Sequence, residues 1–212
     1  MTAYYEGRST PETMSRRYAL FRRAMIFICR VLFGLEIQGE EKVPKGGPLI
    51  VAANHTQYAD PVLVCMAVPR RMQWMAKQQV FEPPYDRLFR FIGSFPVDRE
   101  GGGRSGIRTA LAYLSAGWAL GIFPEGTHRD DGSGKAAKSG AVVLAIRGDA
   151  PVLPVFVGKI PGPLARLRGK RLRLIVGEPI RLDGNLRGGK AYREAADGIL
   201  RSVYALPKVG GP

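Results

Sequence analysis

Short apolar runs of strand length alternate along this chain with longer amphipathic stretches. The apolar runs are PLIVAAN at 48–54, RMQWMAK at 71–77, ALGI at 119–122 and VLPVFVG at 152–158. Stretches with the period of a helix follow or separate them, at 101–117, 138–148 and 191–206. Alternation of strands and helices is typical of an α/β layer. The pattern therefore predicts the α/β class, with a mostly parallel mixed sheet flanked by helices.

Proline and glycine refine these boundaries. A helix is expected at 61–68, because proline is favoured at the first helical position, and another at 86–93, because glycine commonly ends a helix. Strands are expected at 94–99 and 171–180. Pro96 weakens the first of these assignments, since proline is confined mainly to edge strands.

The segment 15–35 has the pattern of an amphipathic helix. At about 100° per residue, one broad face carries Leu20, Phe21, Ala24, Met25, Phe27, Ile28, Val31 and Leu32. Arg16, Arg23 and Arg30 cluster on the opposite side. Such a helix either packs on the domain with its arginines in water or lies in a membrane interface. We predict an N-terminal arm with a membrane-associating amphipathic helix at 1–40, followed by one domain at 41–212.

The net charge of the chain indicates anionic partners. Its 212 residues carry a formal net charge of +14, and the isoelectric point is near 10.2. Nucleic acid, anionic lipid and a phosphorylated substrate all fit such a surface. Cys29 and Cys65 lack metal-ligand spacing, so neither a disulfide framework nor a metal site is expected. No secretory signal or spanning segment is evident, which predicts a protein that is neither exported nor bilayer-spanning.

Three polar clusters follow predicted strands. They are NHTQYAD at 54–60, VDREGGGR at 97–104 and FPEGTHRD at 123–130. Ligands of open α/β sheets bind beyond the carboxyl ends of strands. The three clusters therefore predict one shared site.

His55 and Asp60 are the candidate catalytic pair of the first cluster. A neutral imidazole can accept a hydroxyl proton, and a carboxylate on its other nitrogen fixes the tautomer and stabilises the imidazolium. The alternative is that Asp60 only caps the helix that follows while His55 is an ordinary loop residue. The chain has no GxSxG elbow for a nucleophilic serine. A base without an enzyme nucleophile indicates direct acyl transfer to a substrate hydroxyl.

The motifs NHTQYAD, GSFPVDR and FPEGT, followed by VLPV, resemble in this order the lysophospholipid acyltransferase family, which includes the 1-acylglycerol-3-phosphate acyltransferases. The resemblance spans about residues 48–155. It implies that His55 activates the free hydroxyl of a lysophospholipid and that Asp60 orients it. The acyl group would come from acyl-CoA or acyl carrier protein, with no cofactor and no metal.

The resemblance also implies a set of substrate-binding residues. Arg99 matches the position that holds the acceptor phosphate, and a guanidinium suits phosphate oxygens. Glu125, Gly126 and Thr127 match the acceptor-binding motif, with Glu125 recognising a hydroxyl or positioning Arg99. Lys77 resembles a lysine near the phosphate site, and Asn54 is grouped with these residues because it shapes the loop.

The sequence differs from the family motif at one position that bears on the identity of the acceptor. Members commonly have arginine where this chain has His128, which leaves open other acceptors such as glycerol 3-phosphate, a glycolipid or an ornithine lipid. The resemblance implies a peripheral enzyme on the cytoplasmic face of the cell membrane. Its anionic lipids would bind the arginines of the first helix and the basic stretch 165–173. A basic nucleic-acid-binding protein is the alternative from another class, but no nucleic-acid motif is recognised, so no nucleic-acid partner is expected.

Overall fold

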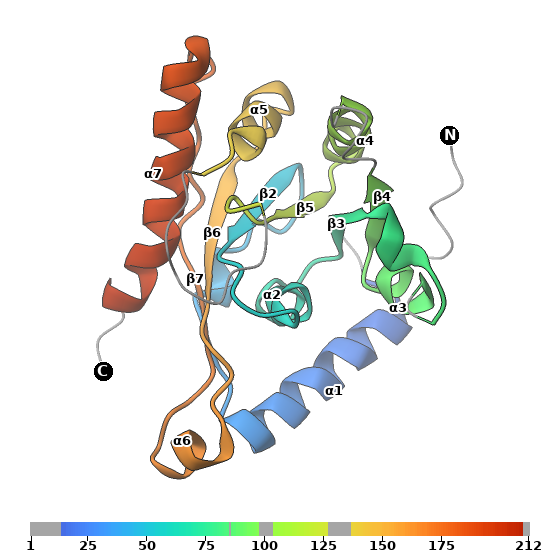
Figure 1. Cartoon of the computed structure of the whole chain (residues 1–212), viewed down its shortest axis with the longest axis vertical. Coiled ribbons are helices and arrows are strands. Elements are labelled where there is room, and N and C mark those ends of the chain that lie inside the picture. The colour runs from blue at the N-terminus through green and yellow to red at the C-terminus, as the bar shows by residue number, and fades with distance from the viewer. Residues whose placement is uncertain (1–13, 85, 98–103, 127–136, 210–212) are drawn as a thin grey trace.

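A seven-stranded mixed sheet forms the centre of the molecule (Figure 1). The computed structural model describes residues 14–84, 86–97, 104–126 and 137–209. In those ranges the strands are β1 (Glu36–Gln38), β2 (Leu49–Ala53), β3 (Met72–Lys77), β4 (Ser94–Val97), β5 (Ala119–Ile122), β6 (Val152–Val157) and β7 (Arg173–Val176). Their order is β1-β7-β6-β2-β5-β3-β4. Only the β6–β7 pair is antiparallel within the described part, which confirms the predicted mostly parallel mixed sheet.

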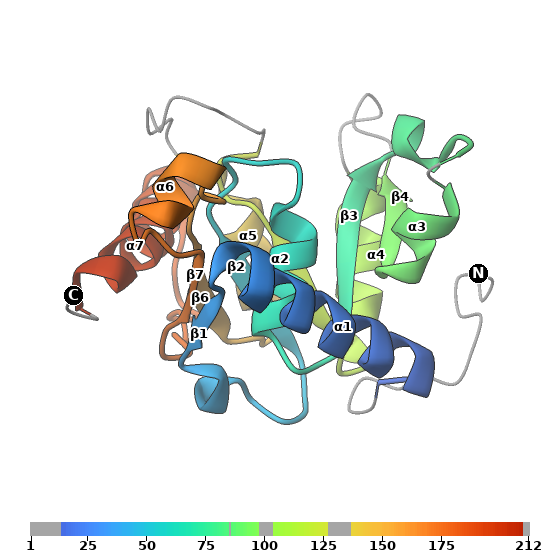
Figure 2. The ribbon, with the colours of Figure 1, turned by 90° about the horizontal axis from the view of Figure 1, so that it is seen from below.

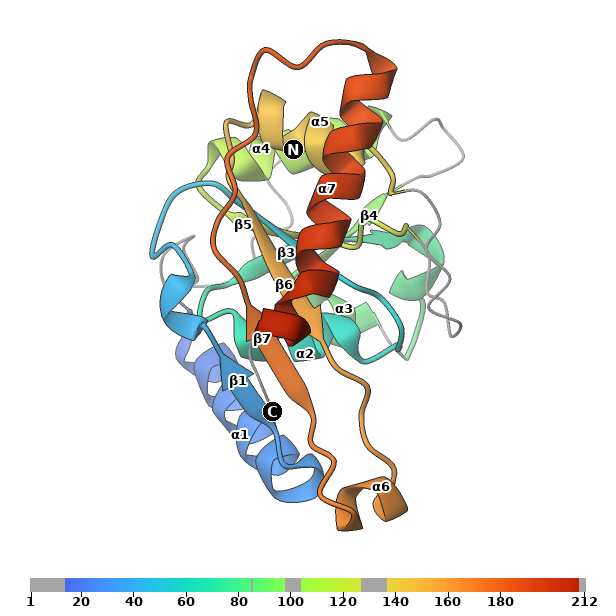
Figure 3. The ribbon, with the colours of Figure 1, turned by 90° about the vertical axis from the view of Figure 1, so that its left-hand side faces the viewer.

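Helices cover both faces of the sheet. They are α1 (Arg16–Phe33), α2 (Asp60–Ala67), α3 (Asp86–Phe91), α4 (Arg104–Ser115), α5 (Gly140–Arg147), α6 (Pro163–Leu167) and α7 (Gly188–Val209), with 3-10 turns at Glu40–Lys42 and Gln78–Phe81. In Figure 1, α4 and α5 lie above the sheet and α7 runs along its left-hand side, while α1 and α2 lie below it. Figure 3 shows α7 running across β6.

Strand β2 divides the core into two layers. All five of its residues are fully buried, as expected for a parallel strand covered on both faces. Leu49, Val51 and Ala53 pack with α2, and Ile50 and Ala52 pack with α4, α5 and α7. The central strand is therefore rigid up to the residue that precedes the His55 loop.

The structure corrects several predicted boundaries. The strand expected at 171–180 ends at Val176, and Ile180 forms only an isolated bridge with Val152. The final helix begins at Gly188, before the predicted residue 191. Pro96 lies in β4, which the order of strands makes an edge strand.

Two elements were not predicted. Strand β1 has three residues and pairs in parallel with β7, so a strand of the sheet lies on the N-terminal side of the boundary predicted at residue 40. Helix α6 has five residues and lies on the chain between β6 and β7. Both are too short to produce a recognisable period in the sequence.

Helix α1 packs on the domain through a different side from the apolar face of the helical wheel. It begins after Ser15, whose hydroxyl accepts a hydrogen bond from the backbone amide of Tyr18. It ends at Gly34, which has the left-handed backbone conformation. Its buried residues are Tyr18 and Cys29, whereas most of the wheel's apolar face is exposed. In Figure 2 this helix crosses the molecule in front of the sheet. Among the described residues, no helix combines the length and the hydropathy that crossing a membrane requires.

Candidate active site

The strand ends that precede the predicted polar clusters lie at one edge of the sheet. Because β2, β5, β3 and β4 are parallel neighbours, their carboxyl ends point the same way. His55 follows β2, Glu125 follows β5, and Lys77 is the last residue of β3. Arg99 and Thr127 lie outside the described residues, as does His128, and the side chain of Lys77 is not described. The described strand ends are therefore arranged as a shared site requires.

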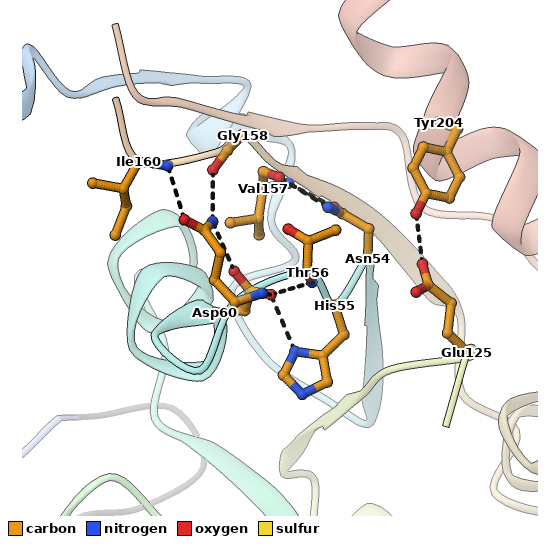
Figure 4. Close-up of polar contacts among 10 residues, drawn as sticks. Asn54, His55, Thr56, Asp60, Glu125, Val157, Gly158, Ile160 and Tyr204 are labelled. Atoms are coloured by element: carbon orange, nitrogen blue, oxygen red, sulfur yellow. Dashed lines mark hydrogen bonds and ion pairs between the residues drawn. The ribbon is translucent and has the colours of Figure 1, made fainter. Parts of the chain in front are cut away.

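His55 and Asp60 form a direct contact. His55 Nδ1 lies 3.0 Å from Asp60 Oδ2, and Asp60 is fully buried while the His55 side chain is 16% exposed. A carboxylate only accepts, so Nδ1 carries the proton in the neutral ring and Nε2 is the basic nitrogen. Figure 4 shows Nε2 on the side of the ring that points away from Asp60. The loop therefore presents one basic nitrogen in a defined orientation.

Asp60 also closes the loop that carries His55. Its Oδ2 accepts hydrogen bonds from the backbone amides of Thr56, at 2.7 Å, and of Gln57, at 2.8 Å. Both amides precede Asp60, which is itself the first residue of α2. The Asp60 carboxylate therefore accepts hydrogen bonds from the loop that precedes α2. These contacts differ from those of a residue that only caps the helix, which was the alternative considered from the sequence. Three donors on one oxygen fix the carboxylate behind the imidazole.

An aromatic stack supports the imidazole from the side. The rings of His55 and Phe123 are stacked with centroids 4.0 Å apart and planes 16° apart. Phe123 in turn stacks on Trp74, whose indole N–H donates to Cys65 Sγ. Gly121 leaves room for this indole, because a Cβ there would lie 2.4 Å from the Trp74 ring. The plane of the His55 ring is therefore held by packing as well as by Asp60.

Two side-chain amides attach the loop to β6 and to the residues that follow it. The side chain of Asn54 donates to Val157 O at 2.8 Å and accepts from Val157 N at 2.7 Å, and it is buried. Gln57, which the sequence did not single out, donates to Gly158 O and accepts from Ile160 N. Asn54 therefore shapes the loop by bonding to a strand more than 100 residues away in the sequence. That it also binds substrate stays a prediction.

Glu125 has a partner on the last helix. Tyr204 of α7 donates its hydroxyl to Glu125 Oε1 at 2.7 Å (Figure 4). Burial, and then the hydrogen bond and charge of Glu125, raise the pKa of Tyr204 well above its ordinary value, so the phenol stays protonated and donates. Gly126 follows with a positive φ of 79° and closes the turn back to Phe123 O. Sequence reasoning missed Tyr204, because a tyrosine in an amphipathic helix looks like a core residue.

Neither cysteine suits a nucleophilic role. Burial raises the pKa of the Cys65 thiol and of the Cys29 thiol, which disfavours the reactive thiolate. Within the described ranges, no group of three His, Cys, Asp or Glu side chains could hold a metal ion. The chemistry that the described geometry supports is removal of a proton from a substrate by Nε2 of His55.

Comparisons with known proteins identify relatives of this chain. The family model described as Acyltransferase matches residues 34–158. The 1-acyl-sn-glycerol-3-phosphate acyltransferase of Bacillus subtilis is 31% identical over 77% of this chain and 82% of its own length. The N-acylphosphatidylethanolamine synthase of Arabidopsis thaliana is also 31% identical, over 66% of this chain and 58% of its own.

A solved structure has the same fold. The crystal structure of the 1-acyl-sn-glycerophosphate acyltransferase of Thermotoga maritima aligns with a TM-score of 0.64 and 21% sequence identity. The alignment covers 92% of this chain and 84% of that one. The arrangement of sheet and helices is therefore that of a known acyltransferase structure.

Proposed function

Because this chain belongs to the Acyltransferase family and is an acyltransferase, we propose that it acylates the free hydroxyl of 1-acylglycerol 3-phosphate, giving phosphatidic acid. The observation that carries this proposal is the His55–Asp60 pair at the carboxyl edge of the sheet. The donor is a fatty acyl thioester of coenzyme A or of acyl carrier protein. The reaction needs acid and base chemistry alone, so no cofactor is invoked.

The pair can perform the transfer in one direct step. Nε2 of His55 accepts the proton of the acceptor hydroxyl as its oxygen attacks the thioester carbonyl carbon. The carbonyl re-forms, the C–S bond breaks, and the departing thiolate takes the proton from the imidazolium. Asp60, held by three donors, stabilises the imidazolium between these two events. No bond forms between the acyl group and the protein.

The acceptor headgroup would bind along the neighbouring strand ends. Lys77 ends β3, and Arg99 lies two residues beyond the last residue of its partner β4. Both cations suit a phosphate on an acceptor whose hydroxyl reaches His55. Glu125, with Gly126 and Thr127, would contact a hydroxyl of the glycerol or position Arg99. The Arabidopsis relative, an N-acylphosphatidylethanolamine synthase, supports a second candidate acceptor, a lipid with a different headgroup.

A variant of Arg99 tests the phosphate contact. Arg99→Ala is expected to raise the apparent KM for 1-acylglycerol 3-phosphate by about 30-fold, because a charge-assisted bidentate contact is lost. The KM for the thioester should change little. Steady-state kinetics with each substrate varied in turn measure both values, and Arg108→Ala, an exposed position on α4, is the matched control. Equal rises for both substrates would contradict the assignment.

Tyr204 is expected to position Glu125. Tyr204→Phe removes one hydrogen bond and keeps the ring, so the unfolding temperature should stay near that of the wild type. The KM for the acceptor should rise by about fivefold, because the carboxylate loses a donor that fixes its rotamer. Tyr192→Phe on the same helix is the control. An unchanged acceptor KM in Tyr204→Phe would show that the contact only joins α7 to the domain.

A peripheral membrane location at the cytoplasmic face fits this function. Leu20, Phe27 and Val31 of α1 are 69%, 68% and 61% exposed, and Arg23 and Arg30 of the same helix are exposed as well. We propose that this face lies in the headgroup region of anionic membranes, where the acceptors reside.

The proposed reaction is tested with a panel of acceptors. Palmitoyl-CoA and palmitoyl carrier protein are each offered with 1-acylglycerol 3-phosphate, glycerol 3-phosphate, lysophosphatidylethanolamine and an ornithine lipid, and products are identified by mass spectrometry. Phosphatidic acid should be the main product. Preference for another acceptor would replace the substrate assignment while leaving the acyltransferase assignment in place.

A further inference from the structure

Helix α6 exposes two large apolar side chains at the end of a projecting arm. Leu164 is 71% exposed and Leu167 is 84% exposed, the latter more than any exposed leucine of α1. The arm leaves the sheet after β6 and returns at β7 (Figure 3). An isolated exposed leucine needs no explanation, but two on a single helical turn away from the core indicate a surface that is covered in use.

This arm lies beside the C-terminal end of α1. The guanidinium of Arg166 lies against Gly34, because a Cβ on that glycine would be 3.0 Å from it. The amide of Leu172 donates to Phe33 O, which ties the returning chain to the same helix end. Figures 1 and 3 both place α6 and α1 at the same end of the molecule, opposite the N-terminal end of α7. The two helices that carry exposed apolar residues therefore lie at the same end of the molecule.

Exposed cations lie on the same two segments as these apolar residues. Lys159, Arg168 and Lys170 are exposed on the arm, and Arg23 and Arg30 are exposed on α1. Within the described part of the chain, none of the five forms an ion pair with a carboxylate. Exposed leucines on segments that also carry unneutralised cations match an anionic bilayer, whose headgroups attract the cations while the acyl boundary accepts the leucines.

We propose that α6 is a second membrane-contacting element, which inserts Leu164 and Leu167 into an anionic bilayer beside α1. The position of α6 relative to the His55 loop relates this membrane contact to the active site. Gln57, in the His55 loop, bonds to Gly158 and Ile160, and α6 begins three residues after Ile160. Insertion of α6 thus holds the His55 loop close to the bilayer surface. This last step rests on the proposed function, whereas the insertion itself does not.

An environment-sensitive fluorophore at the tip tests the insertion. Cys29 and Cys65 are buried, so a thiol-reactive nitrobenzoxadiazole label attaches selectively to an introduced cysteine, Leu167→Cys. Its emission should shift to the blue and gain intensity with vesicles that contain phosphatidylglycerol, and much less with phosphatidylcholine alone. Arg193→Cys, exposed near the N-terminal end of α7, is the matched control and should show no shift. An unshifted label at 167 with the phosphatidylglycerol vesicles would overturn the proposal.

Vesicle partitioning gives a second measurement. Leu164→Ser with Leu167→Ser should lower the partition coefficient about tenfold on anionic vesicles, because two leucines no longer enter the acyl boundary. Thermal unfolding should be unchanged. The same partition coefficient as the wild type, or self-association in place of vesicle binding, would overturn the proposal.

Activity separates this proposal from the proposed function. With a short-chain, water-soluble lysophosphatidate, the Leu164→Ser/Leu167→Ser variant should be as active as the wild type, and it should be slower only with vesicle-bound acceptor. Equal rates of variant and wild type with vesicle-bound acceptor would overturn the role of α6 in presenting the site. A wild type inactive with every acceptor would defeat the proposed function, and the fluorescence result would still decide the insertion.

Discussion

Replacing His55 with alanine is expected to lower kcat by about 1,000-fold or more. The variant removes the nitrogen that accepts the hydroxyl proton, and general base catalysis typically contributes about 100-fold to 10,000-fold. Nδ1 is held by Asp60 and the ring is stacked on Phe123, so Nε2 is the nitrogen that this orientation presents to a substrate. Thiol release from palmitoyl-CoA, followed in the presence of saturating acceptor, measures the loss.

His128 provides the matched control for this variant. It is the second of the two histidines in the chain. His128→Ala should change kcat by less than about tenfold, because loss of a binding contact acts mainly on KM. Circular dichroism should show that both variants unfold near the temperature of the wild type. If His128→Ala were inactive and His55→Ala active, the assignment of the base would be wrong.

Asp60→Asn is expected to lower kcat by about 100-fold or more. The amide oxygen can still accept from the loop, but the negative charge that stabilises the imidazolium is gone and the tautomer of His55 is no longer fixed. Combination with His55→Ala should add little further loss, since the two residues act as a unit. The four proteins of this double-mutant cycle are compared by the same thiol-release assay. Additive losses would show that Asp60 acts independently of His55.

Asp60→Ala separates the structural part of this role. It removes the acceptor of the Thr56 and Gln57 amides in a fully buried position. Leaving buried donors unpaired should lower the free energy of unfolding by about 2 kcal/mol, measured by urea unfolding. Asp60→Asn should be much closer to the wild type. Equal stability of Asp60→Ala and the wild type would mean that the loop is held by Asn54 and Gln57 alone.

The sequence predicted those parts of the site that lie next to strand ends. Parallel strands bring their carboxyl ends to one edge, so His55 and Glu125 could be grouped from the order of apolar runs, whereas Lys77 was named only through the family resemblance. Their supporting contacts could not be found in this way. Tyr204 lies 79 residues from Glu125, and Val157 lies 103 residues from Asn54. Such pairs depend on how α7 and β6 pack, which no local pattern specifies.

Helix α1 illustrates a second limit of sequence patterns. Its period located the helix within two residues at either end, but it did not show which side faces the domain. Tyr18, Met25 and Cys29 pack inward, and Arg22 reaches the carbonyls of Cys65 and Met66 at the end of α2. A helix with two apolar surfaces can bury either one. The surface left exposed is the one that the proposed membrane contact requires.

The central claim is that His55 activates the acceptor hydroxyl for direct attack on the thioester. The measurement that tests it most directly is thiol release from palmitoyl-CoA with and without 1-acylglycerol 3-phosphate, combined with intact-mass analysis of the protein after incubation with the donor alone. The account predicts release that requires the acceptor, phosphatidic acid as the product, loss of both in His55→Ala, and no acylated protein. Acceptor-independent release with an acyl adduct on the chain would contradict it, because the acyl group would then pass through an enzyme nucleophile.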